Sequence, residues 1–211
     1  MPVVQYMSLM SFRVISLGRS LGAHISQKEL NKLEKFKTKE LSLIAVFSAT
    51  WIGYTFISNM AIGQIAHGLD VHIVRSVLLV LIVAMIGRFG GALWMTTIVG
   101  IFYLSSRTPY PPVIITAATM ASGLLYDIYV KLTGYKNATN WKVFPIGVVL
   151  AGLAQSVTTL GILTVLGFFP ERAIQAAWIA GLTKNVTASI IAVFIAVAIV
   201  KRVVPIYKNY G

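Results

Sequence analysis

Long apolar stretches alternate with short polar segments along this chain, beginning at about residue 41. The apolar stretches occupy residues 41–65, 72–87, 89–105, 112–131, 143–168 and 173–200. One helical crossing of a bilayer takes roughly 20 apolar residues, and most of these stretches approach that length. The pattern predicts an all-α integral membrane protein with six transmembrane helices. The second and third are short and meet at the sequence IGRFGGAL.

The residues before and after the apolar stretches have a different character. Residues 1–40 mix apolar residues with serines and basic residues, and Ser26 and Glu29 match a capping box at the start of a lysine-rich helix. We expect residues 1–40 to form a cytoplasmic or interfacial segment with an amphipathic helix on the membrane surface. Residues 41–204 are expected to form the six-helix membrane domain, and residues 205–211 a cytoplasmic tail.

The distribution of charge orients the predicted helices. Only 11% of the residues are charged, against roughly 25% in soluble domains, and the mean hydropathy is +0.80. Fourteen lysines and arginines fall on one side of a six-helix arrangement, and three fall on the other, namely Arg75, Arg107 and Arg172. Basic residues favour the cytoplasmic side. We therefore expect a multi-pass protein of the cell membrane with both termini in the cytoplasm, and no binding of nucleic acid.

Few residues are able to carry out covalent chemistry. The sequence has no cysteine, and it has no phosphate-binding loop of the type G-x-x-x-x-G-K-[ST]. Asp127 is the one carboxylate within the second to sixth stretches, and we expect it to pair with Lys131 one helical turn later. His67, Asp70 and His72 form the one metal-like cluster, but their spacing is too unspecific to indicate a metal site. We expect neither an enzyme nor a cofactor.

A positive charge inside the last apolar stretch is the most informative feature. Lys184 lies about eleven residues into that stretch, where a lysine costs roughly 2.5–3.5 kcal/mol on insertion scales. Lys184, with Asn185 beside it, either contacts a ligand or has a structural role, reaching the interface or pairing with a carboxylate. The other candidates for binding a small polar ligand are Asn59 and Gln155, as hydrogen-bonding groups, and Trp51 and Trp94, which either pack in the core or stack on a flat ligand.

Small residues recur at every fourth position of the first apolar stretch, at Ala45, Ala49 and Gly53. This spacing places them on nearly one face of a helix, which lets another helix approach closely. Two interpretations are open: the face packs inside the protein, or it docks a partner subunit. The last stretch has the same spacing at Ala188, Ala192 and Ala196.

The order of these features resembles the substrate-binding (S) component of energy-coupling factor vitamin transporters. The resemblance covers about residues 36–204 and rests on Ala45-x-x-x-Ala49 after a basic segment, the glycines of RFGGAL, and Lys184–Asn185. It implies that the alanines dock on a transmembrane coupling subunit, which rests on two ATPase subunits. It also implies that Lys184 and Asn185 bind a small vitamin-like heteroaromatic molecule, over which the loop at residues 59–72 closes.

A second interpretation is an accessory or structural subunit of a larger respiratory or oxygenase complex. The long N-terminal segment, which a neighbouring chain is able to hold, and the few charged residues in the spans favour it. An intramembrane enzyme is disfavoured because no catalytic pair is visible. The first two interpretations predict different partners, either a coupling subunit with ATPases or the other subunits of the complex.

Overall fold

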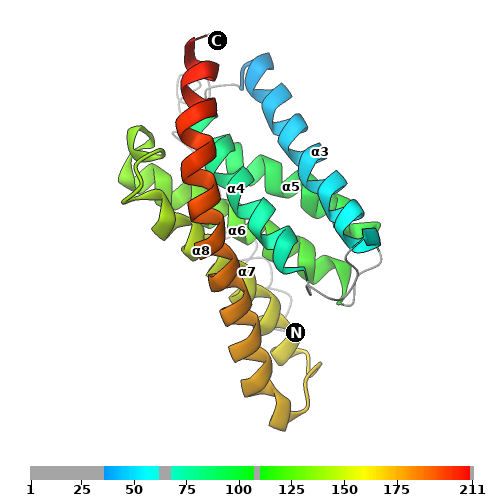
Figure 1. Ribbon diagram of the computed structural model, residues 1–211. Helices are drawn as coiled ribbons and strands as arrows, with labels where there is room; N and C mark the ends of the chain where they lie inside the picture. Colours follow the sequence, from blue (N-terminus) through cyan, green and yellow to red (C-terminus); the bar gives the residue numbers. More distant parts are fainter. Residues whose placement is uncertain (1–35, 62–67, 107–109, 210–211) are drawn as a thin grey trace, which may run out of the picture. The chain divides into compact units, whose positions relative to one another are not determined.

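The computed structural model describes residues 36–61, 68–106 and 110–209, and all regular structure in these ranges is helical (Figure 1). The chain from Thr38 onward forms one compact unit. Ser26 and Glu29, the predicted start of the amphipathic helix, lie outside the described ranges. The helices are α3 (Thr38–Ala61), α4 (Leu69–Ile86), α5 (Gly91–Leu104), α6 (Pro112–Thr133), the short 3-10 helix η1 (Tyr135–Asn137), α7 (Phe144–Val165) and α8 (Glu171–Asn209).

Each apolar stretch predicted from the sequence corresponds to one α-helix. Five of them, α3, α4, α6, α7 and α8, are long and apolar enough to cross a membrane. Helix α5 has 14 residues; at 1.5 Å per residue it is about 21 Å long, shorter than the roughly 30 Å of a hydrocarbon core. The described part of the chain is therefore an all-helical fold that fits a multi-pass membrane protein.

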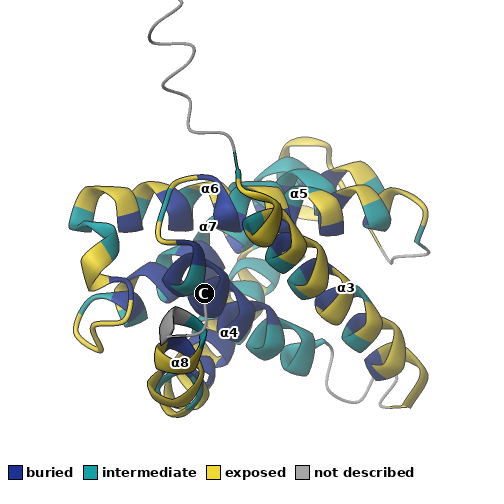
Figure 2. Ribbon diagram, turned by 90° about the horizontal axis from the view of Figure 1, so that it is seen from above, coloured by how far each residue is buried: buried dark blue, intermediate teal, exposed yellow. Residues whose placement is uncertain are grey.

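Helix α4 is the most deeply buried of the long helices. It contacts α3, α5, α7 and α8, so its side chains from Arg75 to Ala84 are buried on every face. Figure 2 shows the contrast with α3 and α8, which each present an exposed face outward. In that view α8 is seen almost end-on, whereas α5 and α6 lie across it, so the helices are not all parallel.

The turn between α4 and α5 depends on glycine. Gly87 and Gly90 have φ angles of 69° and 101°, in the left-handed region that glycine adopts without a steric penalty. The N–H of Gly87 donates to the carbonyl of Val83 at 2.9 Å and ends α4. The glycines of IGRFGGAL therefore let α5 begin only a few residues after α4 ends.

Asp127 of α6 caps the start of α5. Its Oδ2 accepts hydrogen bonds from the backbone N–H groups of Gly90 and Leu93, at 3.1 and 2.8 Å. These donors belong to the first turn of a helix, where they have no partner within the helix itself. The predicted pair between Asp127 and Lys131 is therefore wrong. The ammonium of Lys131 instead lies 5.3 Å from the ring centroid of Phe89, in the α4–α5 turn.

Contacts between distant segments place several helix ends close together. They are the start of α3, the α4–α5 turn, and the ends of α6 and α8, and we call this part of the fold the basic end. The ammonium of Lys39 in α3 lies 4.1 Å from the ring centroid of Tyr207 in α8. Glu40 of α3 forms an ion pair with Arg88 in the α4–α5 turn. The start of the first described helix and the end of the last therefore lie on the same side of the fold.

Helix α8 is longer than the apolar stretch that predicts it. It has 39 residues, from Glu171 to Asn209, and Pro205 lies inside it. Residues 205–209, expected to be a separate tail, continue this helix.

Candidate functional site

A cavity of about 880 Å³ lies at the opposite end of the fold from the basic end. It is lined by the last turns of α3 and α5, the second half of α7, and the beginnings of α4, α6 and α8. Its volume is within the range of small-molecule sites, roughly 300–1,000 Å³. All six helices therefore contribute to one site, although their contributing residues are far apart in the sequence.

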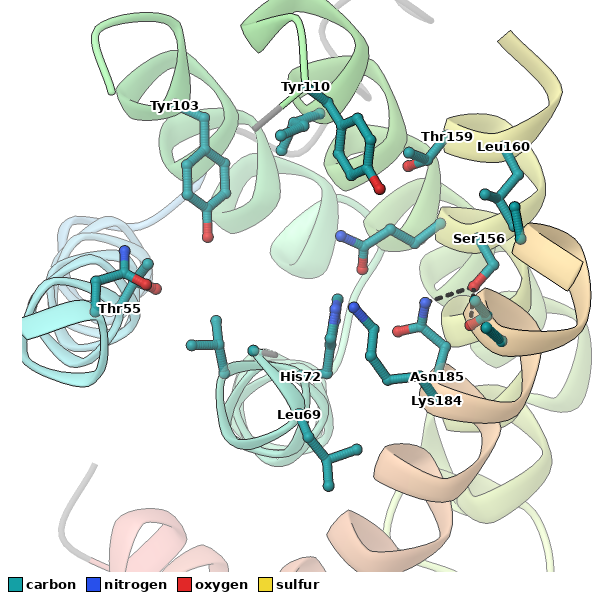
Figure 3. A pocket seen from close by; sticks show the side chains of 18 of the residues that line it. Thr55, Leu69, His72, Tyr103, Tyr110, Ser156, Thr159, Leu160, Lys184 and Asn185 are labelled. Carbon is teal, nitrogen blue, oxygen red and sulfur yellow. Dashed lines mark hydrogen bonds between the residues drawn. The ribbon is translucent and has the colours of Figure 1, made fainter. Parts of the chain in front are cut away.

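One wall of the cavity, formed by α4, α7 and α8, carries most of its polar groups. Lys184 of α8 extends its ammonium group into the cavity beside the imidazole of His72 of α4 (Figure 3). Asn185 Nδ2 donates to Ser156 Oγ of α7, and Ser156 Oγ donates to the carbonyl of Gly181 at 3.2 Å. These bonds tie α7 to α8 and fix the wall that holds Lys184.

The facing wall is aromatic and apolar. Tyr103 of α5 and Tyr110, just before α6, point their hydroxyl groups into the cavity (Figure 3). The hydroxyl group of Tyr103 lies near the side chains of Thr55 and Trp51 of α3. Ile115 of α6 adds an aliphatic side chain, whereas the other apolar side chains of the lining come from α4, α7 and the segment before α8: Leu69, Val71, Leu160 and Phe169.

Four of the six residues predicted to bind substrate line the cavity: Asn59, Gln155, Lys184 and Asn185. Among the described residues, the side-chain oxygens of Gln155 and Asn185 are buried and have no hydrogen-bond partner. Buried acceptors of this kind are usually satisfied by protein, water or ligand. The two amides are therefore available to accept hydrogen bonds from a molecule in the cavity.

Neither predicted tryptophan lines the cavity. Trp51 is 1% exposed and belongs to the packed face of α3, between Ser48 and Thr55. Trp94 of α5 is 52% exposed and is not among the lining residues. The aromatic surface of the site comes instead from tyrosines, which sequence reasoning missed because nothing local distinguishes them from tyrosines at a membrane interface.

The small residues Ala45, Ala49 and Gly53 lie on an exposed face of α3. A Cβ added at Gly53 meets nothing within 4 Å. Helix α3 packs through a different face, whose residues are Ile44, Ser48, Trp51, Thr55 and Ser58. The interpretation of the α3 strip as internal packing is therefore wrong for the described chain. The strip on α8 is the opposite case, because Ala188, Ala192 and Ala196 are buried.

Among the residues that the structure describes, no three His, Asp or Glu side chains lie close enough together to hold a metal ion. His67 of the predicted cluster lies outside those residues. Asp70 accepts a hydrogen bond from Ser58 of α3, whereas His72 lines the cavity. The two described members of the cluster thus make different contacts.

Arg75 is the residue that sequence reasoning misplaced. It was counted among the basic residues outside the spans, but it lies in α4 and is 0% exposed. Its charge acts on both His72 and Lys184, which places the guanidinium close to the polar wall. The available signal was its position inside the apolar stretch 72–87, the same signal that drew attention to Lys184.

The chain matches no protein-family model, no curated protein and no solved structure. Its chemistry must therefore be argued from the cavity and from the exposed faces of its helices.

Proposed function

We propose that this protein is the substrate-capture subunit of an ATP-driven importer for a small, vitamin-like heteroaromatic molecule. The observation that carries the proposal is the cavity, whose lining combines Lys184, Asn185 and Gln155 on one wall with Asn59 of α3 and tyrosine side chains on the elements that face it. A site with convergent polar groups on one wall and apolar surface on the other suits a flat molecule with hydrogen-bonding atoms.

The arrangement of the two ends supports uptake from outside. Basic residues gather at the cytoplasmic side of membrane proteins, so the basic end is proposed to face the cytoplasm. Although α5 is short, it begins at the capped turn of the basic end and brings Tyr103 to the cavity. Six alternating helices follow, with both ends of the chain in the cytoplasm and the cavity facing outward from the cell membrane.

The exposed strip on α3 supports a membrane partner. Ala45, Ala49 and Gly53 form an exposed face of small residues, and a Cβ added at Gly53 meets nothing within 4 Å. Membrane helices associate closely through such small-residue faces. Since the chain has no phosphate-binding loop of its own, the proposal takes its energy from ATPase subunits joined through a transmembrane coupling subunit that docks on this strip.

The test is to purify the protein from its native membrane and to identify both its bound small molecule and its protein partners. Wild type is expected to carry a heteroaromatic ligand and to co-purify with ATPases. Lys184→Met is expected to weaken ligand binding by about 1.5–3 kcal/mol, the range for a hydrogen bond to a charged group. Calorimetry with the identified ligand measures this difference.

The matched control is Lys142→Met, which removes an exposed lysine just before α7. The cavity is lined by the second half of that helix, so this lysine is not part of the lining. Its affinity should equal that of wild type. Undiminished binding by Lys184→Met would assign the lysine a structural role. A wild type without ligand that co-purifies with a respiratory or oxygenase complex would favour an accessory subunit.

A further inference from the structure

Arg75 is a fully buried cation in the middle of the helices that form the polar wall. Its Nη2 lies 3.5 Å from Ser76 Oγ, at the limit of a hydrogen bond. Within the described chain, Nε and Nη1 have no hydrogen-bond partner. A guanidinium has five N–H donors, and a buried one is normally paired with an anion or fully hydrogen-bonded. Arg75 therefore lies in a site that lacks its expected counter-charge.

The surroundings of the guanidinium place it between α7 and α8. A Cβ built on Gly152 of α7 would lie 3.5 Å from Arg75 Nη2, 3.3 Å from the carbonyl oxygen of Asn185, and 2.6 Å from Ser189 Oγ. Gly152 thus lets α7 approach α8 closely, because an added Cβ would clash with Ser189 Oγ. Asn185, part of this surrounding, also lines the cavity, so Arg75 lies directly behind the polar wall.

Three of the four described carboxylates make contacts elsewhere, and the fourth, Glu171, is exposed at the start of α8. Glu40 pairs with Arg88 at the basic end, Asp127 caps α5, and Asp70 accepts from Ser58 of α3. The described lining of the cavity contains no aspartate or glutamate, but it does contain Lys184 and His72. Two cations, Arg75 and Lys184, thus lie within electrostatic range of each other, although like charges repel.

We infer that the cavity binds an organic anion, with its acidic group at the Lys184 ammonium and its apolar body against Tyr103 and Tyr110. Lys184 contacts the acidic group, and Arg75 acts from behind the wall as a positioning residue that makes the potential at this point positive. A bound anion would supply the counter-charge that the buried Arg75 guanidinium lacks within the described chain. This inference rests on the proposed function and narrows its substrate class to acids.

The experiment uses the full-length protein in detergent and two kinds of probe. Mass spectrometry identifies the small molecule extracted from wild type. Thermal unfolding, followed by tryptophan fluorescence, then compares matched pairs at millimolar concentration: nicotinate against nicotinamide, and benzoate against benzamide. Phenyl phosphate distinguishes a phosphate from a carboxylate as the preferred acid. We expect an acidic extracted molecule, and stabilisation by the anions but not by the amides.

The variants separate an electrostatic role from a structural one. Arg75→Met should unfold at or above the temperature of the ligand-free wild type and should lose the preference for acid over amide, with about 10- to 100-fold weaker acid binding. Arg75→Lys should retain the preference. Arg202→Met, which removes an exposed arginine of α8 beyond the cavity lining, should behave as wild type. If Arg75→Met does not fold, Lys184→Met tests the same loss of acid preference.

Three results would overturn the inference. If the extracted molecule is neutral or cationic, or if acids and amides stabilise the protein equally, the ligand is not specifically an anion. The proposed capture function is then unaffected. An Arg75→Met protein that binds acids and amides with equally reduced affinity assigns Arg75 a structural role only. If nothing is extracted and no probe stabilises the protein, the cavity is not a ligand site, and the proposed function fails together with the anion.

Discussion

Asp127 shows how one buried carboxylate connects two helices that the chain links only through a loop. By accepting from the N–H groups of Gly90 and Leu93, it lets α5 begin directly after a tight turn. The same residue type four positions before a lysine usually suggests a pair within one helix. Here the unsatisfied donors of a neighbouring helix attract the carboxylate more strongly, because they are buried and have no other partner.

Removing this cap should destabilise the protein without changing its ligand. Asp127→Ala is expected to lower the free energy of unfolding by about 1–2 kcal/mol, the upper part of the range for lost helix caps. Unfolding by denaturant in detergent micelles, followed by tryptophan fluorescence, measures the change. Lys131→Ala serves as the control and should have a smaller effect than Asp127→Ala. Equal destabilisation by the two variants would instead indicate that Asp127 pairs with Lys131.

At the scale of helices, two strips of small residues with the same spacing have opposite environments. The α8 strip, Ala188, Ala192 and Ala196, is buried, whereas the α3 strip is exposed. The sequence contains no signal for this difference. Both helices are apolar on most faces, so the periodicity that identifies the buried face of a soluble helix is absent.

Large side chains on the two strips should therefore have different effects. Ala192→Trp is expected to prevent accumulation of folded protein, because overpacking a core typically costs 1–3 kcal/mol and a tryptophan adds far more volume than one methylene. Ala49→Trp should fold and bind ligand normally but lose uptake, since it would block the partner helix that we propose docks on α3. Monodispersity on size-exclusion chromatography and uptake by intact cells distinguish the two. Normal uptake by Ala49→Trp would contradict docking on this strip.

The helix positions themselves were predictable, and the reason is physical. A helix that crosses lipid must satisfy its backbone internally, so apolar composition alone marks its approximate extent. Lys184 and Asn185 were identified for a related reason, since a polar residue in such a stretch is costly. Arg75 lies in the same kind of stretch, but the count of basic residues assigned it to the outer side of the membrane. The tyrosines of the cavity and the outward face of α3 depend on packing between helices, which no local pattern encodes.

For the molecule as a whole, the separation of basic end and cavity makes a prediction about sidedness. Because the chain has no cysteine, a single introduced cysteine is the only thiol available for labelling. A cysteine at Lys142 should react with a membrane-impermeant maleimide only after the cells are opened. A cysteine at Glu171, at the start of α8, should react in intact cells. The reverse pattern would place the cavity in the cytoplasm and contradict uptake.

The unequal lengths of α5 and α8 have a further consequence, which concerns the lipid. At 1.5 Å per residue, 14 and 39 residues span about 21 and 58 Å, and a hydrocarbon core of uniform thickness near 30 Å matches neither. Helix α5 presents exposed apolar side chains, among them Ile98, Ile101 and Leu104, which lipid must cover. Hydrophobic mismatch is then relieved by bilayer thinning beside α5 and by tilting or protrusion of α8.

A membrane thin enough for α5 should therefore favour the folded protein. After reconstitution, we expect a higher unfolding temperature in dimyristoyl than in dierucoyl phosphatidylcholine, because the longer lipid must be compressed further around the short helix. The comparison of the two lipids uses the wild-type protein and needs no variant. Equal unfolding temperatures would mean that α5 is shielded from lipid by a partner. In the cell, such a protein would concentrate where the bilayer is thinnest, so membrane composition would help decide where it works.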